Sequence, residues 1–221
     1  MATRAPLTRE RIVEAAVRVA DEGGLAQVTM RNVAKELGVE AMSLYHHLDG
    51  KSALLDLLAD WIFTCIELPS PGRPWRPAMH GRASSARAAL AAHPWALGLV
   101  ESRRSPGPHL LTHHDAVLGS LRTQGFSVAL AAHAFSAIDA YVYGFVLTEV
   151  SLPFEADERA DEFVEEVRDV LDADAYPHLV EMIAEQVTGK DYSYGDEFDF
   201  GLELVLDGLE QHLGAEGTPP S

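Results

Sequence analysis

Apolar residues recur at the spacing of an amphipathic helix over most of this 221-residue sequence, which predicts an all-α fold. No segment alternates convincingly like a strand, although residues 141–150 taken alone are compatible with one. Prolines, glycines and polar runs divide the pattern. The expected helices cover residues 7–24, 29–37, 41–47, 51–66, 78–93, 94–103, 109–124, 127–150, 158–172, 177–187 and 196–213.

The breaks between these helices predict the domain organisation. Segment 69–77, PSPGRPWRP, is expected to be a loop because proline recurs every two or three residues. Segment 187–197 is polar and contains glycine, and residues 214–221 resemble a frayed tail. We expect an N-terminal domain over residues 1–50, a bridging helix over 51–66 and a larger domain over 67–221.

Residues 29–51, TMRNVAKELGVEAMSLYHHLDGK, predict two short helices joined by a tight turn. Thr29 precedes an apolar periodic segment and suits an N-cap, and Gly38 follows its last periodic residue and suits a helix end. Asp49 is the expected N-cap of the next helix. The core face of that helix is expected to be Leu54, Leu55, Leu58, Trp61 and Ile62.

This pattern is a helix-turn-helix, whose second helix enters the major groove of DNA. Arg31 suits a bidentate contact with guanine, while Ala41 and Met42 offer apolar contact, for example to a thymine methyl. The residues suited to phosphate are Thr29, Ser43, Tyr45 and Lys51, and those suited to either bases or phosphates are His46 and His47. The alternative is an ordinary core hairpin in which Tyr45 is a packing aromatic.

The same residues resemble the DNA-binding domain of the TetR family of transcriptional repressors, and the resemblance covers residues 7–66. The segments LRTQGFSVALAAHAFSAIDAYVYGFVL and EFDFGLELVLDGLEQHL are similar to the tetracycline-repressor type of ligand domain. The resemblance implies a homodimer that binds double-stranded operator DNA and releases it when a small molecule enters the C-terminal domain.

By matching position, the resemblance implies a DNA-facing set of Thr29, Arg31, Ala41, Met42, Ser43, Tyr45, His46 and Lys51, with His47 matching a family histidine. Tetracycline repressors carry glutamine, proline and tryptophan where this chain has Ala41, Met42 and His46, so a different operator is expected. Val100 and Glu67 stand at the positions of two ligand-site histidines. Valine cannot ligate a metal, so a tetracycline–magnesium effector is not expected.

The net charge of −17 is unusual for a DNA-binding protein, but its distribution along the chain is uneven. Residues 1–51 are neutral overall, residues 52–138 carry +2, and residues 139–221 carry −19. The acidic end repels DNA from the wrong face, and the neutral head predicts modest nonspecific affinity.

Other features of the composition bear on location. There is no signal-peptide core and no run of 18 apolar residues, and the lone Cys65 fits a reducing compartment. We therefore expect a cytoplasmic protein with no membrane partner.

The resemblance places an effector pocket between the middle helices of the C-terminal domain. A mainly apolar cavity with a few polar anchors is expected there, suited to a hydrophobic, drug-like or polyketide-like molecule. Residues of each of these types are more often core residues than ligand contacts. The candidates are Trp61, His93, Trp95, Leu97, Val100, His114, Leu118, Leu121, His133, Tyr141 and Phe145.

Helix 196–213 carries a broad apolar stripe of Phe198, Leu202, Val205, Leu206 and Leu209. This stripe is expected either in the core or, as the resemblance implies, in a dimer bundle with helix 127–150. Two-fold symmetry then predicts a palindromic operator with half-sites roughly 34–36 Å apart.

His109 and His113 are one helical turn apart, which is a metal-ligand spacing, but no HExxH motif accompanies them. A partly exposed cluster of His109, His113 and His114 is the simpler interpretation, and a metal-responsive or pH-responsive regulator is the alternative. No metal or cofactor is therefore expected.

No GxSxG, P-loop, Rossmann glycine pattern or CxxC pair is present, so a catalytic activity is not expected. The leading hypothesis is a ligand-responsive dimeric repressor. A constitutive repressor or protein-interaction module, and a helical enzyme, remain as rivals. The sequence does not decide between repression and activation.

Overall fold

The computed structural model describes residues 6–70, 72–100, 102, 105–152, 171–188 and 192–216. Within these ranges the chain is helical and contains no strand, which confirms the expected fold class. The helices are α1 (Arg9–Gln27), α2 (Met30–Leu37), α3 (Ala41–Leu44), α4 (Lys51–Trp61), α5 (Trp75–Ala92), α6 (Leu97–Val100), α7 (Pro108–Arg122), α8 (Val128–Glu149), α10 (Pro177–Met182) and α11 (Glu197–Glu216).

Four shorter helical segments join or extend these helices. Three are 3-10 turns, and the fourth continues α10 as a π-helix. They are η1 (Ile62–Thr64), η2 (Pro94–Ala96), η5 (Tyr194–Asp196) and the π-helical η4 (Ile183–Val187). The helix expected over residues 158–172 lies outside the described residues apart from its last two.

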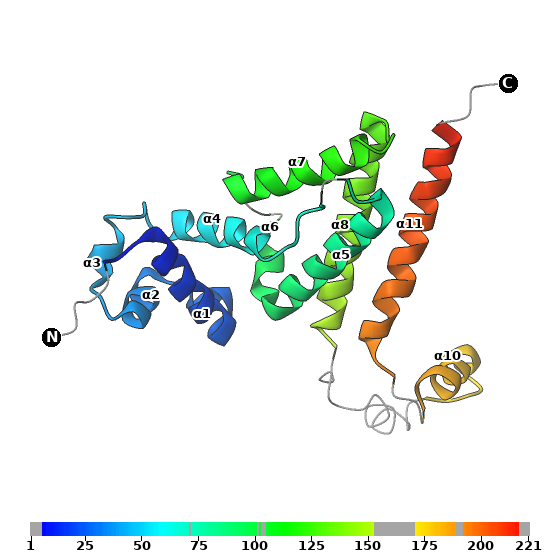
Figure 1. Ribbon diagram of the computed structural model, residues 1–221. Helices are drawn as coiled ribbons and strands as arrows, with labels where there is room; N and C mark the ends of the chain where they lie inside the picture. Colours follow the sequence, from blue (N-terminus) through cyan, green and yellow to red (C-terminus); the bar gives the residue numbers. More distant parts are fainter. Residues whose placement is uncertain are drawn as a thin grey trace.

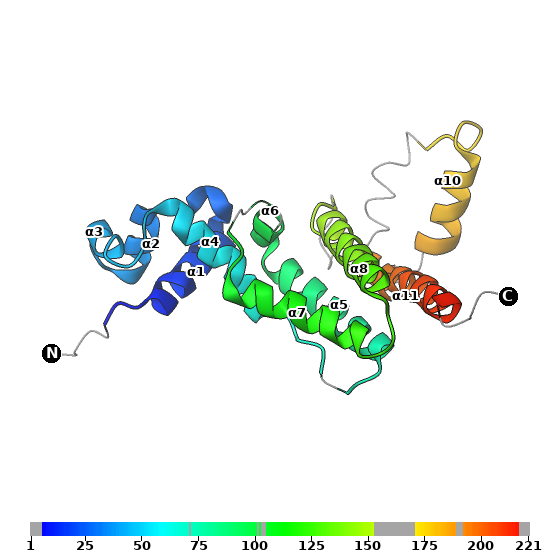
Figure 2. The ribbon, with the colours of Figure 1, turned by 90° about the horizontal axis from the view of Figure 1, so that it is seen from above.

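The molecule is elongated (Figures 1 and 2). Helices α1, α2 and α3 form a head at one end, and α11 lies along α8 at the other end. Helix α4 packs against α1 on the head side and against α6 and α7 on the other side. Helix α4 therefore contacts both the head and the helices of the rest of the chain.

Local signals specify the head as expected. The Thr29 hydroxyl accepts a hydrogen bond from the backbone N–H of Asn32 at 3.1 Å, which caps α2. Gly38 ends α2 in the left-handed region with φ 62°. The fully buried side chains of Ile12, Val33 and Leu44 join α1, α2 and α3 in one core.

Two boundaries in the head differ from the sequence-based expectation. Helix α3 covers only residues 41–44, and a turn continues the chain to His47. Asp49 is exposed and does not cap α4; instead Gly50 precedes the helix with φ 97°, and α4 has no side-chain cap. The expectation for Asp49 was wrong because a sharp reversal before α4 uses the left-handed region that favours glycine.

Segment 69–77 is also shorter as a loop than expected, because α5 begins at Trp75. Pro77 lies in the first turn of α5, where backbone N–H groups have no intrahelical acceptor, so proline removes no helical hydrogen bond. The Trp75 ring packs edge-on against Phe126 with centroids 5.0 Å apart, which holds the start of α5 on the end of α7.

Helix α8 is, among the described residues, the one helix long and apolar enough to span a membrane by length and composition. In this structure it packs against α5, α7 and α11. Its buried Asp139 forms an ion pair with the buried Arg82 of α5. The apolar composition of α8 therefore matches a core helix covered on several sides.

Helix α11 packs against α8 and is attached to α5 by charge. Arg76 forms ion pairs with Glu203, Asp207 and Glu210, the last at 2.8 Å. His80, one turn further along α5, has Nε2 3.5 Å from a carboxylate oxygen of Asp199. One face of the acidic helix is thus partly neutralised by α5.

Candidate functional site

The outer surface of the head carries the residues expected to face DNA. Met42 is 70% exposed and Tyr45 is 50% exposed, which is unusual for side chains of this size. Arg31, His46 and Lys51 are exposed as well. The core hairpin alternative for Tyr45 does not fit this exposure.

The remaining predicted DNA-facing residues are half-buried: Thr29, Ala41, Ser43 and His47. The Thr29 hydroxyl serves as a helix cap, so any DNA contact is additional to a structural role. The carbonyl oxygen of His47 accepts a hydrogen bond from Nε of Arg9 at 3.1 Å, which ties the turn after α3 to α1. The turn that presents Tyr45 and His46 is thereby held in place.

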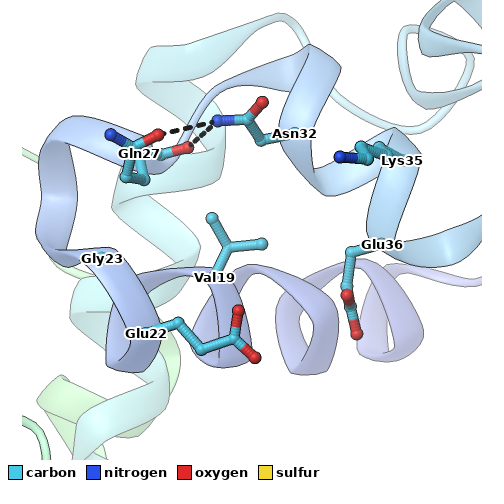
Figure 3. Close-up of a pocket in the computed structure, with 7 residues that line it drawn as sticks. All are labelled: Val19, Glu22, Gly23, Gln27, Asn32, Lys35 and Glu36. Carbon is cyan, nitrogen blue, oxygen red and sulfur yellow. Dashed lines mark hydrogen bonds between the residues drawn. The ribbon is translucent and has the colours of Figure 1, made fainter.

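The head also has an open hollow of about 430 Å³ between α1 and α2 (Figure 3). Val19, Glu22, Asn32, Lys35 and Glu36 are among the residues that line it. The Asn32 amide donates to the backbone oxygen of the neighbouring Gln27 at 2.8 Å. None of the expected effector residues lies there, and its lining is mainly charged and polar.

A polar and aromatic cluster joins the head to the larger domain. Asp21 of α1 accepts a hydrogen bond from the indole N–H of Trp95 at 2.7 Å, and the same oxygen lies 2.7 Å from Nδ1 of His93. Trp61 of α4 stacks on Trp95 and meets His93 edge-on. Three of the expected effector residues therefore lie at the interface with α1.

Asp60 of α4 makes a second link. Its Oδ1 accepts a hydrogen bond from the backbone N–H of Leu110 at 2.9 Å, in the first turn of α7, and the residue is buried. A Cβ on Gly107 would lie 2.2 Å from Cγ of Asp60, so only glycine leaves room for this carboxylate. The bridging helix is thus joined directly to the start of α7.

The centre of the larger domain contains a buried polar trio. Arg82 of α5 donates from Nε to Nε2 of His113 on α7 at 3.0 Å, and from Nη1 to Asp139 on α8. Arg82 is 2% exposed and His113 is 0% exposed. Burial, together with the charge of Arg82 and the nearby His114, lowers the pKa of His113 from 6.5 to about 3.

Two nitrogens of this trio lack a hydrogen-bond partner among the described residues: Nη2 of Arg82 and Nδ1 of His113. A buried polar group left in this state costs about 1–3 kcal/mol. The ring of Phe63 in η1 lies 5.5 Å from the His113 ring, and the adjacent His114 packs edge-on against Phe135 at 4.6 Å. Aromatic rings therefore lie beside His113, the imidazole of the polar trio.

Tyr141 and Phe145 lie in a separate aromatic cluster between α8 and α11. The Phe145 ring stacks on Tyr194 at 4.8 Å and meets Phe198 edge-on at 5.1 Å. The Arg87 guanidinium lies 5.1 Å from the Phe145 ring centre and pairs with Glu149. The expected effector residues are thus divided between several clusters.

Of the other effector candidates, Leu121 is fully buried, whereas Leu97, Val100 and Leu118 are half-buried. His133 differs from the expectation because it is exposed. It lines a hollow of about 380 Å³ beside Ala129, Leu130, His212 and Ala215 of α8 and α11. The position of His133 on the outward face of α8 explains the difference.

The expected dimer residues need a correction. Phe198, Leu202, Leu206 and Leu209 are between 0% and 7% exposed within the single chain, so little of their surface remains for a partner; Val205 is half-buried. Among the described residues, the large apolar side chains that α11 exposes are Phe200, at 66%, and Leu204, at 59%. The chosen stripe thus belongs mainly to the core of the chain, where α11 packs against α8, which is the alternative that the sequence left open.

The histidine cluster gives no support for a metal site. His113 is enclosed by Arg82 and Phe63, while His109 is exposed on the first turn of α7. Within the described ranges, no group of three or more histidine, cysteine, aspartate or glutamate side chains is placed to hold a metal ion.

The sequence analysis missed Asp21, Asp60, Arg82 and Asp139. A signal was available for two of them: an arginine in an alanine-rich helix and one aspartate in a long apolar helix are both expected to be paired when buried.

Comparisons with known proteins agree with this geometry. Residues 12–58 match the family described as bacterial regulatory proteins, tetR family, and residues 68–213 match the tetracyclin repressor-like C-terminal domain. The HTH-type transcriptional repressor DrrR1 of Streptomyces coeruleorubidus is 36% identical over 214 residues, covering 92% of this chain and 77% of the relative.

Solved structures show the same similarity over nearly the full length. Apo ActR from Streptomyces coelicolor aligns with a TM-score of 0.78 at 29% identity, covering 97% of this chain and 100% of that chain. ActR in complex with actinorhodin aligns with a TM-score of 0.75 at 30% identity, covering 93% and 96% respectively.

Proposed function

Because this chain belongs to the TetR family of DNA-binding transcriptional regulators, we propose that it is a homodimeric repressor that a small apolar effector releases from a palindromic operator. The observation that carries this proposal is the outer surface of the head, where large side chains that normally avoid water are exposed. Met42 and Tyr45 project from α3 and the turn that follows it, at the position where such a motif meets the major groove.

The head supplies contacts of two kinds. Arg31, in the first turn of α2, suits a bidentate contact with guanine, which specifies sequence. Lys51 and the start of α4, which has no side-chain cap, suit a phosphate, because helix N-termini attract anions. Phosphate contacts orient the head, and base contacts select the operator.

The effector signal passes through α4. ActR, the structural neighbour, has been solved with actinorhodin, which supports a small-molecule effector for this chain as well. Asp60 connects α4 to the first turn of α7, and Trp61 contacts Trp95 beside Asp21 of α1. A shift of α7 on effector binding moves α4, and α4 moves the head relative to the partner's head. Coupling of this kind is typically about 1–3 kcal/mol.

The two-fold contact uses the outward faces of α8 and α11. Phe200 and Leu204 are the large exposed apolar side chains of α11, and Leu147 of α8 is 58% exposed. Exposed apolar side chains of this size are typical of an interface between subunits.

We place the protein in the cytoplasm and assign it no catalytic role. A tetracycline–magnesium effector is disfavoured because Val100 stands at the position of a family metal ligand, and a valine side chain offers no ligand atom.

The test is a selection from random DNA duplexes at low salt, followed by binding assays at one fixed salt concentration. We expect one palindrome with half-sites a helical turn apart. Arg31→Ala is expected to weaken binding by roughly 5–150-fold and to relax one base position. Arg18→Ala is the matched control, because it removes an equal charge that already pairs with Glu36 at 2.7 Å.

Recovery of no enriched sequence by the folded protein would overturn the proposal. So would unchanged affinity in a variant that combines Arg31→Ala with Tyr45→Ala.

A further inference from the structure

The buried trio contains more hydrogen-bond donors than its own residues can satisfy. Arg82, His113 and Asp139 come from three helices, α5, α7 and α8, and meet where solvent does not reach. A guanidinium has five N–H donors and no acceptor. The bonds to His113 and Asp139 engage Nε and Nη1, and Nη2 has no acceptor among the described residues.

The bond from Arg82 fixes the tautomer of His113. Because Nε of Arg82 can only donate, Nε2 of His113 must accept and carries no proton. A neutral imidazole then holds its single proton on Nδ1, and burial keeps the pKa of His113 low enough for the ring to stay neutral. Nδ1 of His113 is therefore a second buried donor without an acceptor.

The charge of the trio restricts the kind of group that can satisfy these donors. The positive charge of Arg82 is balanced by Asp139, and His113 is neutral, so the trio has no net charge. A carboxylate placed here would add an uncompensated buried charge, which is strongly unfavourable. A carbonyl oxygen supplies two acceptor lone pairs without adding a charge.

We infer that the effector presents a neutral carbonyl oxygen, such as that of a ketone, quinone or lactone, to the Nδ1–H of His113 and the Nη2–H of Arg82. This inference rests on the proposed function and adds to it the chemical class of the ligand. The body of the ligand is apolar and ring-shaped, because Phe63 and the ring pair of His114 and Phe135 flank the trio. The carbonyl oxygen of the effector gives both unsatisfied donors an acceptor only in the bound state, so this contact stabilises the effector-bound conformation.

The experiment uses the full chain without DNA and three tricyclic probes of nearly equal shape: fluorene, 9-fluorenone and 9-fluorenecarboxylate. Isothermal titration calorimetry is expected to show fluorenone binding at least tenfold more tightly than fluorene, a difference equivalent to about 1.4 kcal/mol. The carboxylate is expected to bind more weakly than the ketone. Infrared spectroscopy is expected to show a lower carbonyl stretching frequency for bound fluorenone.

Variants test whether the trio causes this preference. His113→Phe removes the Nδ1–H group and leaves Nη2–H of Arg82 as a donor, so it is expected to weaken the preference for the ketone and to reduce the infrared shift. His113→Asn keeps one donor and one acceptor and is expected to restore part of both. His109→Phe makes the same substitution at an exposed position on α7 and is expected to change neither.

One further measurement uses only the wild-type protein, so its result does not depend on whether the variants fold. Nitrogen-15 NMR of the wild-type protein labelled at histidine is expected to show the His113 proton on Nδ1. A proton on Nε2, equal binding of ketone and hydrocarbon, tighter binding of the carboxylate, or binding of none of the three probes would each overturn the inference. The regulatory function is tested separately by the operator selection, so the two failures are distinguishable.

Discussion

The link between Asp60 and α7 gives the sharpest test of the signalling route. In the wild-type protein, the backbone N–H of Leu110 donates to the buried carboxylate of Asp60 at 2.9 Å. Asp60→Ala removes this acceptor. Removal of a side-chain acceptor at a helix N-terminus costs about 0.5–2 kcal/mol. Removal of its negative charge adds about 0.3–1 kcal/mol. We therefore expect Asp60→Ala to lower the free energy of unfolding by about 1–3 kcal/mol.

The same substitution separates effector binding from DNA release. In the absence of DNA, Asp60→Ala is expected to change the affinity for the effector only slightly, because Asp60 does not belong to the polar trio. Release of the operator is expected to need much more effector, because α7 no longer moves α4 through a hydrogen bond. Asp60→Asn keeps an acceptor and loses only the charge, so its loss of stability is expected to be below about 1 kcal/mol.

Urea unfolding followed by circular dichroism measures the stability, and fluorescence anisotropy of a labelled operator duplex measures release. Asp115→Ala is the control, because it removes an exposed carboxylate from the same helix α7. If Asp60→Ala unfolded at the wild-type urea midpoint and released DNA at the wild-type effector concentration, apolar contacts alone would join α4 to α7, and the reasoning would be refuted.

Gly107→Ala places a Cβ 2.2 Å from Cγ of Asp60 and is expected to lower the unfolding free energy by about 1–3 kcal/mol, measured in urea. Phe200→Glu with Leu204→Glu adds charge to exposed apolar positions and is expected to yield folded monomers, measured by analytical ultracentrifugation with circular dichroism. Burial lowers the pKa of His113 to about 3, so from pH 6.5 down to pH 3 mainly the unfolded chain binds this proton. Above pH 6.5 the ring is neutral in both the folded and the unfolded state. Below pH 6.5 the free energy of unfolding falls by up to about 1.4 kcal/mol per pH unit. Urea titrations of His113→Asn are expected to show a free energy of unfolding that depends less on pH.

The head could be predicted in detail because its signals are local. Thr29 caps α2 and Gly38 ends it, and each effect depends on residues within one turn. The error at Asp49 also concerns a local signal, but here the local sequence offered two solutions. Two neighbouring residues, Asp49 and Gly50, suited the start of α4, and the required backbone conformation, which the sequence does not state, selected glycine.

The connections of the larger domain could not be predicted because they join distant parts of the chain. Asp60 meets Leu110 across 50 positions, and Arg82 meets Asp139 across 57. A lone charge in an apolar helix indicates that a partner exists but does not identify it. Periodicity also left open whether the apolar stripe of α11 that contains Phe198 faces the core of the same chain or a partner, because both environments favour apolar side chains.

The row of acidic residues on α11 has a consequence for how the molecule is made. Asp199, Glu203 and Asp207 follow one another at intervals of four, and like charges at this spacing destabilise an isolated helix. Arg76, which pairs with Glu203 and Asp207, lies more than 120 residues before them and is synthesised first. We therefore expect α11 to have little structure by itself and to become ordered when it docks on α5. Phe200 and Leu204 are presented only then, so the proposed contact between two chains depends on this docking.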